Sequence, residues 1–393
     1  MMEFEYWWLL TLPLFFTLGW FAARVDIKQL LSESTTLPVA YFKGLNFLIA
    51  DQPDKAVEAF SEAVRVNSES LELHFALGSL FRRTGEVDRA IHLHLDLLEN
   101  RELAEPQKRA VNAELAQDYL KAGLYDRAEE LFISLDDNRY RQPALRALLE
   151  IYVREREWAR AIETATELER LSGVPFRKEI AQYYCEMAIT SILSGDTHSA
   201  GRELNLALEA NKNCVRANIM LGDIEAEAGA HLAAISYWKR IEFQQPEYLG
   251  LVATKLLKSY RALKKLNDGL IQLSEYAETY KLPSLLTGLY EATLAEEGAE
   301  NAAKLARNEL IRKPSLQTLD QLLQARAMDN SPRSQVNQQD LQLMQQTVRN
   351  AIGNRSAYYC DQCGFRAKQY HWQCPACNAW ESLPSEPSEA ANK

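Results

Sequence analysis

The chain has little glycine and proline for its length, with 16 Gly and 13 Pro among 393 residues. This scarcity argues against an all-β fold, which needs many tight turns, and favours helices. Basic residues are not in excess either, because 44 Lys and Arg face 54 Asp and Glu, for a net charge of −10. An acidic balance gives no electrostatic reason to expect a nucleic-acid partner.

Familiar catalytic motifs are also missing. The sequence contains no G-x-x-x-x-G-K-[ST], no H-E-x-x-H and no G-x-S-x-G. The helical repeats described below leave little sequence in which an active site could lie. We therefore expect no enzymatic activity, no catalytic residues and no organic cofactor.

Cysteine is sparse and unevenly placed. Four of the six cysteines fall within 18 consecutive positions near the carboxyl end. The other two, Cys185 and Cys214, lie in apolar helical patterns. Free cysteine is commonly a core residue, so we interpret these two as buried free thiols rather than as a disulfide or a catalytic pair. A reducing compartment is consistent with all six.

Charges are absent from residues 6–23, a stretch of 18 residues. A helix of that length covers about 27 Å, close to the hydrocarbon thickness of a bilayer. Trp7 and Trp20 stand near its two ends, where amphipathic rings prefer the membrane interface. Arg24 and Lys28 follow the run. The positive-inside rule thus predicts a single-pass anchor with the rest of the chain in the cytoplasm.

Two other interpretations of this start are weaker. A signal peptide begins with basic residues and ends at small ones, whereas here Glu3 and Glu5 precede the run, and Trp20 and Phe21 stand beside its only small pair. A buried core helix would have a polar face, and this run has none. We expect a transmembrane anchor over residues 1–23 and a linker over 24–37.

Paired amphipathic helices recur between residues 38 and 353. The alanines that mark the second helix of each pair are Ala56, Ala90, Ala128, Ala161, Ala200 and Ala234. Their spacing is 34, 38, 33, 39 and 34 residues, and a period near 34 is typical of tetratricopeptide repeats. We predict an all-α superhelix of about eight repeats, the last ones degenerate, with further helices around 316–327 and 339–352. Such an array exposes a concave surface that binds peptides or proteins.

Small residues in the first helix of a pair, such as Gly44, Gly78 and Gly222, are expected where two helices cross closely. The second-helix alanine is predicted to meet that small residue, and the aromatic that follows to fill the remaining groove. Turn glycines, such as Gly85 and Gly123, stand between the helices.

Two C-x-x-C pairs close the chain, Cys360 with Cys363 and Cys374 with Cys377, separated by ten residues. This spacing predicts a tetrathiolate site for one metal ion, with iron and zinc both compatible. No βαβ pattern surrounds either pair, which argues against a thioredoxin-like redox motif. We expect His371 to be a surface residue, because four thiolates already complete a tetrahedron.

The residue after each second cysteine is expected to be left-handed, which Gly364 and Asn378 allow. Aromatic residues should form an apolar coat around the metal; they are Tyr358, Tyr359, Phe365, Trp372 and Trp380. We predict a metal domain over 354–381 that docks on the last repeats, and a disordered tail over 382–393.

Two further groups of residues could suggest binding sites. Lysine and arginine recur at helical spacing between Lys255 and Lys265, and we favour a solvated face over a partner or lipid site. His92 and His94 are two residues apart on a helix, so they point to different faces and should not share a metal.

One predicted span, a repeat array and a terminal C-x-x-C-G…C-P-x-C together resemble the lipopolysaccharide assembly protein B family of Gram-negative bacteria. The terminal part resembles a rubredoxin-type metal domain, whose ligands would be Cys360, Cys363, Cys374 and Cys377. The resemblance implies an inner-membrane adaptor that restrains lipopolysaccharide synthesis. It also implies that the adaptor helps the membrane AAA+ protease FtsH degrade the lipid A deacetylase LpxC.

The alternatives are a rubredoxin-like electron-transfer protein and a general peptide-binding co-chaperone. Two features disfavour electron transfer. Asn378 stands where rubredoxins usually have glycine, and the ten residues between the two C-x-x-C pairs are fewer than rubredoxins have. Other lipopolysaccharide-synthesis and inner-membrane proteins are further candidate partners. The sequence leaves the oligomeric state open, a homodimer included.

Overall fold

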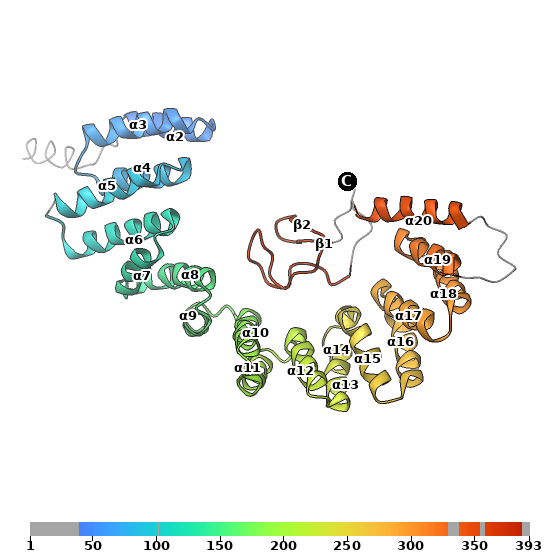
Figure 1. Ribbon diagram of the computed structural model, residues 1–393. Coiled ribbons are helices and arrows are strands. Elements are labelled where there is room, and N and C mark those ends of the chain that lie inside the picture. The colour runs from blue at the N-terminus through green and yellow to red at the C-terminus, as the bar shows by residue number, and fades with distance from the viewer. Residues whose placement is uncertain (1–38, 101, 329–337, 354–357, 387–393) are drawn as a thin grey trace, which may run out of the picture. The chain divides into compact units, whose positions relative to one another are not determined.

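The computed structural model describes residues 39–100, 102–328, 338–353 and 358–386 (Figure 1). The chain divides into two compact units, Met1–Ile151 and Tyr152–Lys393. The predicted anchor and linker lie outside the described residues. Within the described part, every helix is too short or too polar to cross a bilayer.

The first unit is a succession of helices, and all but the last of them pack against their neighbours in chain order. They are α2 (Val39–Ile49), α3 (Pro53–Val66), α4 (Leu71–Thr84), α5 (Val87–Glu99), α6 (Glu105–Ala122), α7 (Tyr125–Ser134) and α8 (Asn138–Glu155), which runs into the second unit. Ala56, Ala90 and Ala128 are completely buried where these helices meet. The burial of these alanines confirms that they mark helix contacts.

The second unit continues the pattern of paired helices (Figure 1). Its helices are α9 (Trp158–Ser172), α10 (Arg177–Leu193), α11 (Thr197–Ala210), α12 (Val215–Glu227), α13 (His231–Lys239), α14 (Ile241–Gln244), the 3₁₀ helix η2 (Pro246–Val252), α15 (Ala253–Ala262), α16 (Leu266–Tyr280), α17 (Pro283–Glu296), α18 (Ala299–Arg312), α19 (Leu316–Met328) and α20 (Gln338–Gly353). Helices α19 and α20 lie where the sequence predicted its last two. The number of repeats and the domain limits stay predictions.

Glycines of the first helix in a pair touch the large ring of the second helix. A Cβ on Gly44 would lie 2.7 Å from the Phe60 ring, and one on Gly222 would lie 2.3 Å from Nε1 of Trp238. The atoms nearest to each glycine therefore belong to the ring, which fills the space beside the glycine. The absence of a Cβ sets how closely the two helices approach.

Substituting Gly222 with alanine should destabilise the second unit. The new methyl group must displace the Trp238 ring, which is 1% exposed, and overpacking of this kind costs about 1–3 kcal/mol. Gly201→Ala on α11 is the matched control, because nothing lies within 4 Å of its added Cβ. There the gain in helix propensity should stabilise the protein by about 0.5–1 kcal/mol. Urea unfolding of both variants measures the difference, and equal effects would contradict the proposed packing.

The predicted turn glycines adopt the conformation that the turns require. Gly85 has φ 85° and Gly123 has φ 76°, and both end a helix in the left-handed region. Gly195 and Gly229 repeat this in the second unit, with φ of 83° and 79°. A side chain with a Cβ is rarely stable there, so these positions fix where each pair of helices reverses.

The basic residues between Lys255 and Lys265 belong in part to ion pairs within the second unit. Lys255 Nζ lies 2.6 Å from Asp223, and Arg261 lies 2.9 Å from Glu296. These pairs link α15 to α12 and α17 at the surface. They favour the interpretation of a solvated face over a partner or lipid site.

His92 and His94 point to different sides of α5, as predicted. His94 is fully buried, and its Nδ1 lies 2.5 Å from Oδ2 of Asp118. Arg82 donates to the other carboxylate oxygen of Asp118 at 2.6 Å. This buried network joins α4, α5 and α6, which gives His94 a structural role, whereas His92 borders a surface pocket.

Candidate metal centre and its docking surface

Two short hairpins carry the C-x-x-C pairs. Strand β1 (Tyr358–Tyr359) pairs in antiparallel fashion with β2 (Arg366–Ala367), with Tyr358 opposite Ala367. A single antiparallel bridge between Gln373 and Trp380 closes the second hairpin. Each cysteine pair therefore lies in the turn of a hairpin. We call residues 358–386 the metal module and each C-x-x-C turn a knuckle.

The two knuckles have the same backbone hydrogen bonds. The amide of Gly364 donates to the carbonyl of Cys360 at 2.9 Å, and the amide of Asn378 donates to that of Cys374 at the same distance. Gly364 has φ 72° and Asn378 has φ 59°. Both values confirm the predicted left-handed conformation, which lets each turn bend its two sulfurs toward one point.

The four sulfurs lie within 4.8 Å of one another. Cys360 Sγ is 3.6 Å from Cys377 Sγ, and Cys363 Sγ is 3.7 Å from Cys374 Sγ. Sulfurs bonded to one metal at ~2.3 Å in a tetrahedron are about 3.8 Å apart. The observed separations therefore fit one tetrahedrally coordinated ion, and four thiolates suit zinc and iron alike.

Local groups favour the thiolate form of Cys360. The Ser382 hydroxyl lies 3.3 Å from its sulfur. This contact, followed by the backbone amides of Cys363 and Gln362, lowers the pKa of Cys360 to about 6. The thiolate is the form that binds metal, but desolvation and the neighbouring cysteines raise the pKa values of Cys363 and Cys377, so a bound cation would have to stabilise the remaining thiolates near neutral pH.

The aromatic residues around the cysteines serve two different purposes. Tyr358 and Phe365 pack against the buried Cys360 and Cys374, which confirms part of the predicted coat. Trp372 instead packs into the core of the helical array. The prediction that all the aromatic residues coat the metal was therefore wrong, because some of them face the repeats.

Ring stacking forms one part of the contact between the module and the array. Trp372 stacks on Tyr248 of η2 with centroids 5.4 Å apart and planes 12° apart. Tyr370 meets the same Tyr248 ring edge-on at 6.2 Å. Aromatic pairs of this kind contribute about 0.5–1.5 kcal/mol each beyond the area that they bury.

Arg216 of α12 forms the centre of the contact and is only 6% exposed. Its guanidinium carbon lies 5.9 Å from the Trp372 ring and 5.7 Å from the Trp380 ring. It donates to Gln182 Oε1 at 3.1 Å and to Glu186 Oε1 at 2.7 Å, both on α10. The array thus holds a buried cation in place for two tryptophans of the module.

Glu381 of the module forms polar contacts with α10. Its Oε1 accepts a 2.7 Å hydrogen bond from Gln182, and its Oε2 lies 3.2 Å from Lys178 Nζ. Trp380, the residue before it, meets the Tyr183 ring edge-on at 6.2 Å. We call the surface formed by α10, α12, η2 and the start of α17 the docking surface.

The segment after the module is more ordered than predicted. Ser382, Leu383 and Ser385 are buried, and Ser385 Oγ donates to the carbonyl of Glu247 at 2.8 Å. Glu386 accepts a 3.1 Å hydrogen bond from the amide of Ser284, at the start of α17. The prediction of a disordered tail was therefore wrong for residues 382–386, while 387–393 lie outside the described residues.

The docking surface does not lie where the sequence predicts. We expected the module to dock on the last repeats, yet its partners lie on α10, α12, η2 and the first turn of α17. Nothing in the local sequence of Arg216 or Tyr248 distinguishes them. The sequence of the module did contain an indication: Trp372 and Trp380 carry more apolar surface than so small a metal site can bury by itself, so they indicate a contact with another part of the chain.

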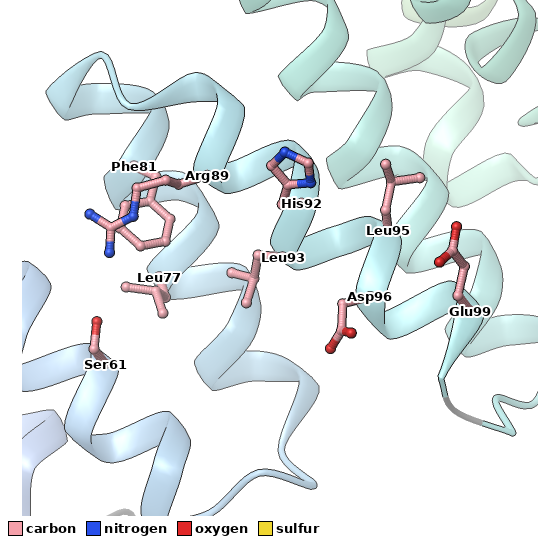
Figure 2. Close-up of a pocket in the computed structure, with 9 residues that line it drawn as sticks. All are labelled: Ser61, Leu77, Phe81, Arg89, His92, Leu93, Leu95, Asp96 and Glu99. Atoms are coloured by element: carbon pink, nitrogen blue, oxygen red, sulfur yellow. The ribbon is translucent and has the colours of Figure 1, made fainter.

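A surface pocket on the first unit is a second candidate site (Figure 2). It holds about 650 Å³ between α3, α4 and α5. Its apolar floor includes Leu77 and Phe81, and Arg89 lies over the Phe81 ring at 4.2 Å. Arg89 is also paired with Glu86. This pocket is open and contains no cluster of metal ligands or paired catalytic groups, so the metal module is the stronger candidate.

Known proteins match both parts of the chain. The model described as the rubredoxin metal binding domain matches residues 358–384, and a tetratricopeptide repeat model matches residues 43–104. Among solved structures, yeast Tom70 is 12% identical and covers 79% of this chain and 84% of its own, with a TM-score of 0.32.

Whole-length relatives are more informative. Lipopolysaccharide assembly protein B of Escherichia coli strain K12 is 32% identical over 376 residues, which is 95% of this chain and 96% of that protein. The protein of the same name from Haemophilus influenzae is 30% identical over 386 residues, with the same coverage. By this identity and coverage, the chain belongs to the lipopolysaccharide assembly protein B family.

Proposed function

We propose that this protein is an inner-membrane-anchored adaptor that regulates lipopolysaccharide assembly, with its repeats in the cytoplasm. The relatives' name supports the process, and the repeat match supports a binding role rather than chemistry. The observation that carries the proposal is the metal module bound to the repeats through Arg216, Tyr248 and Glu381. These contacts fix a composite surface that neither part forms alone.

The metal, when bound, supplies the folding energy that so small a module lacks. The chain's own residues then orient the module. Trp372 and Trp380 reach the buried Arg216, while Glu381 engages Gln182. A rigid surface of this kind loses less conformational entropy on binding a partner than a flexible one would.

The predicted anchor over residues 1–23 gives the adaptor its location. Tethering would confine the repeats to a thin layer below the bilayer and raise their effective concentration for membrane-bound partners. We propose the membrane protease FtsH and its substrate, the lipid A deacetylase LpxC, as those partners. Holding both on one surface would speed degradation of the deacetylase and so limit lipid A synthesis.

The half-life of LpxC tests this proposal in Gram-negative cells that lack their own copy of the protein. We expect the full chain to shorten that half-life several-fold, and the C374S/C377S variant, present at an equal level, to have no effect. Gly201→Ala is the control, since it alters neither module nor docking surface. An unchanged half-life with the full chain would refute the role in LpxC turnover. Regulation by the metal-free variant would refute the role of the module.

Electron transfer is the second candidate function, because Cys363 and Cys377 are exposed and an iron site would be within reach of a redox partner. The purified protein would then be coloured and show a reversible one-electron couple. A colourless zinc form that regulates LpxC fully would exclude this function.

A further inference from the structure

Cys185 and Cys214 lie side by side inside the second unit. Their sulfurs are 3.8 Å apart, although 29 residues separate them in sequence. Both are completely buried and neither forms a disulfide, which confirms the prediction of free thiols. The proximity itself was not predicted. A disulfide has an S–S distance of about 2.05 Å, so the two sulfurs need to approach by about 1.7 Å.

The two thiols have unequal surroundings. Cys214 is the residue directly before α12, and Arg216 lies two residues further on. The hydrogen bond with Cys185 lowers the pKa of Cys214, as do the Ala217 amide and the Arg216 charge. That same hydrogen bond, together with burial, raises the pKa of Cys185. Because Cys214 lies at the start of α12 and two residues from the Arg216 charge, its thiolate is the better stabilised of the two, so we assign Cys214 as the attacking thiol and Cys185 as the resolving thiol.

One side chain connects this pair to the metal module. Gln182 Nε2 lies 3.9 Å from Cys214 Sγ and 2.7 Å from Glu381 Oε1. The Oε1 atom of the same Gln182 accepts from Arg216, whose guanidinium faces the two tryptophans of the module. Cys185 follows Gln182 by three residues and Cys214 precedes Arg216 by two. Gln182 and Arg216 are the two polar residues that hold the module on the docking surface, and each lies within one helical turn of a cysteine of the pair. A change in the thiol pair therefore acts directly on both of them.

We propose that Cys185 and Cys214 form a reversible intrachain disulfide on oxidation by a hydroperoxide, and that this modification weakens docking of the metal module. The Cys214 thiolate attacks the peroxide oxygen, which gives a sulfenic acid and releases hydroxide. The Cys185 thiol then attacks that sulfur, forming the disulfide and releasing water. In total, two thiols and one hydrogen peroxide give one disulfide and two waters.

The reducing cytoplasm fits a transient bond of this kind, because thiol reductants would restore the pair. Because both thiols are buried, peroxide reaches them only when the contact between the module and the docking surface opens. The rate of oxidation should therefore fall as the module docks more firmly. Closing the bond draws the start of α12 toward α10 and displaces Gln182 from Glu381. The proposal does not depend on the partners of the protein and stands apart from its role in LpxC turnover.

The test uses the purified, metal-loaded full chain titrated with hydrogen peroxide. Peptide mass spectrometry without reductant should find Cys185 joined to Cys214 before a chromogenic chelator detects any metal release. Hydrogen–deuterium exchange of the module should rise in the same samples, and dithiothreitol should reverse both changes. The proposal is overturned if this crosslink is missing while the metal stays bound, or if the crosslinked protein keeps the module fully protected.

Two variants separate the thiol pair from the metal cysteines. Cys214→Ser places a hydroxyl at the N-cap of α12, a position that favours serine, and Cys185→Ala leaves only a small gap. Both variants should keep their metal and show no increase in exchange at the peroxide dose that affects the parent. If either variant responds as the parent does, oxidation acts at another site and the inference fails.

Discussion

Serine at both Cys374 and Cys377 is expected to unfold the metal module completely while the repeats stay helical. The module has two short hairpins and a small buried cluster around Cys360 and Cys374. Domains below about 40 residues rarely fold without a metal or disulfide. A structural zinc site contributes on the order of 10–16 kcal/mol of apparent folding free energy, so losing two of its ligands removes the module's main source of stability.

Three measurements on the C374S/C377S variant check this result. Metal analysis should find less than one ion per chain, and the fluorescence of Trp372 and Trp380 should shift toward that of exposed indole. The far-ultraviolet circular dichroism should remain that of the parent, because the helices have their own cores. Cys185→Ala is the control, since it removes a buried thiol and should keep the metal. A folded module without metal would contradict this explanation.

Alanine at Arg216 should free an otherwise intact metal module from the repeats. The change removes a buried cation that contacts Trp372 and Trp380, and it leaves Gln182 and Glu186 without their donor. The loss of the pair with Glu186 destabilises the array itself, whereas the two cation–π contacts act on docking and contribute about 0.5–2 kcal/mol each. Losing both contacts corresponds to about a tenfold or larger shift from the docked to the undocked state.

Tryptophan fluorescence and hydrogen exchange across residues 358–386 measure this effect. Metal content should be unchanged, which distinguishes lost docking from an unfolded module. Arg89→Ala is the matched control: Arg89 also lies over a ring, 4.2 Å from that of Phe81, but its side chain is 55% exposed. The control should alter stability by less than about 1 kcal/mol. If Arg216→Ala left the exchange unchanged, Arg216 would not be an anchor.

The metal site and the repeats were predictable because each depends on short-range spacing. The distance between Cys360 and Cys363 is set by one turn, and the left-handed residue after it must be Gly or a residue such as Asn. In the repeats, the period of buried alanines reflects helix pairs that pack only on their neighbours. Both patterns can be seen in a single sequence.

The docking surface could not be predicted in the same way. Arg216, Tyr248 and Ser284 contact the module from separate helices, and no local pattern marks them. The module residues that they contact are visible in the sequence as aromatic or polar residues. Whether those residues face the metal or the repeats depends on the three-dimensional position of the module. The contact between Cys185 and Cys214 was hidden for the same reason, since helix pairing brings the two sulfurs together.

Hydrogen–deuterium exchange of the full chain, before and after metal removal by a chelator, tests the central claim most directly. If the metal holds the module in its docked form, exchange should rise in the module and also in α10, α12 and η2. Helices α3 to α7 in the first unit should not change. Loss of the metal with unchanged protection of α10, α12 and η2 would show that the module does not depend on the metal to cover the docking surface.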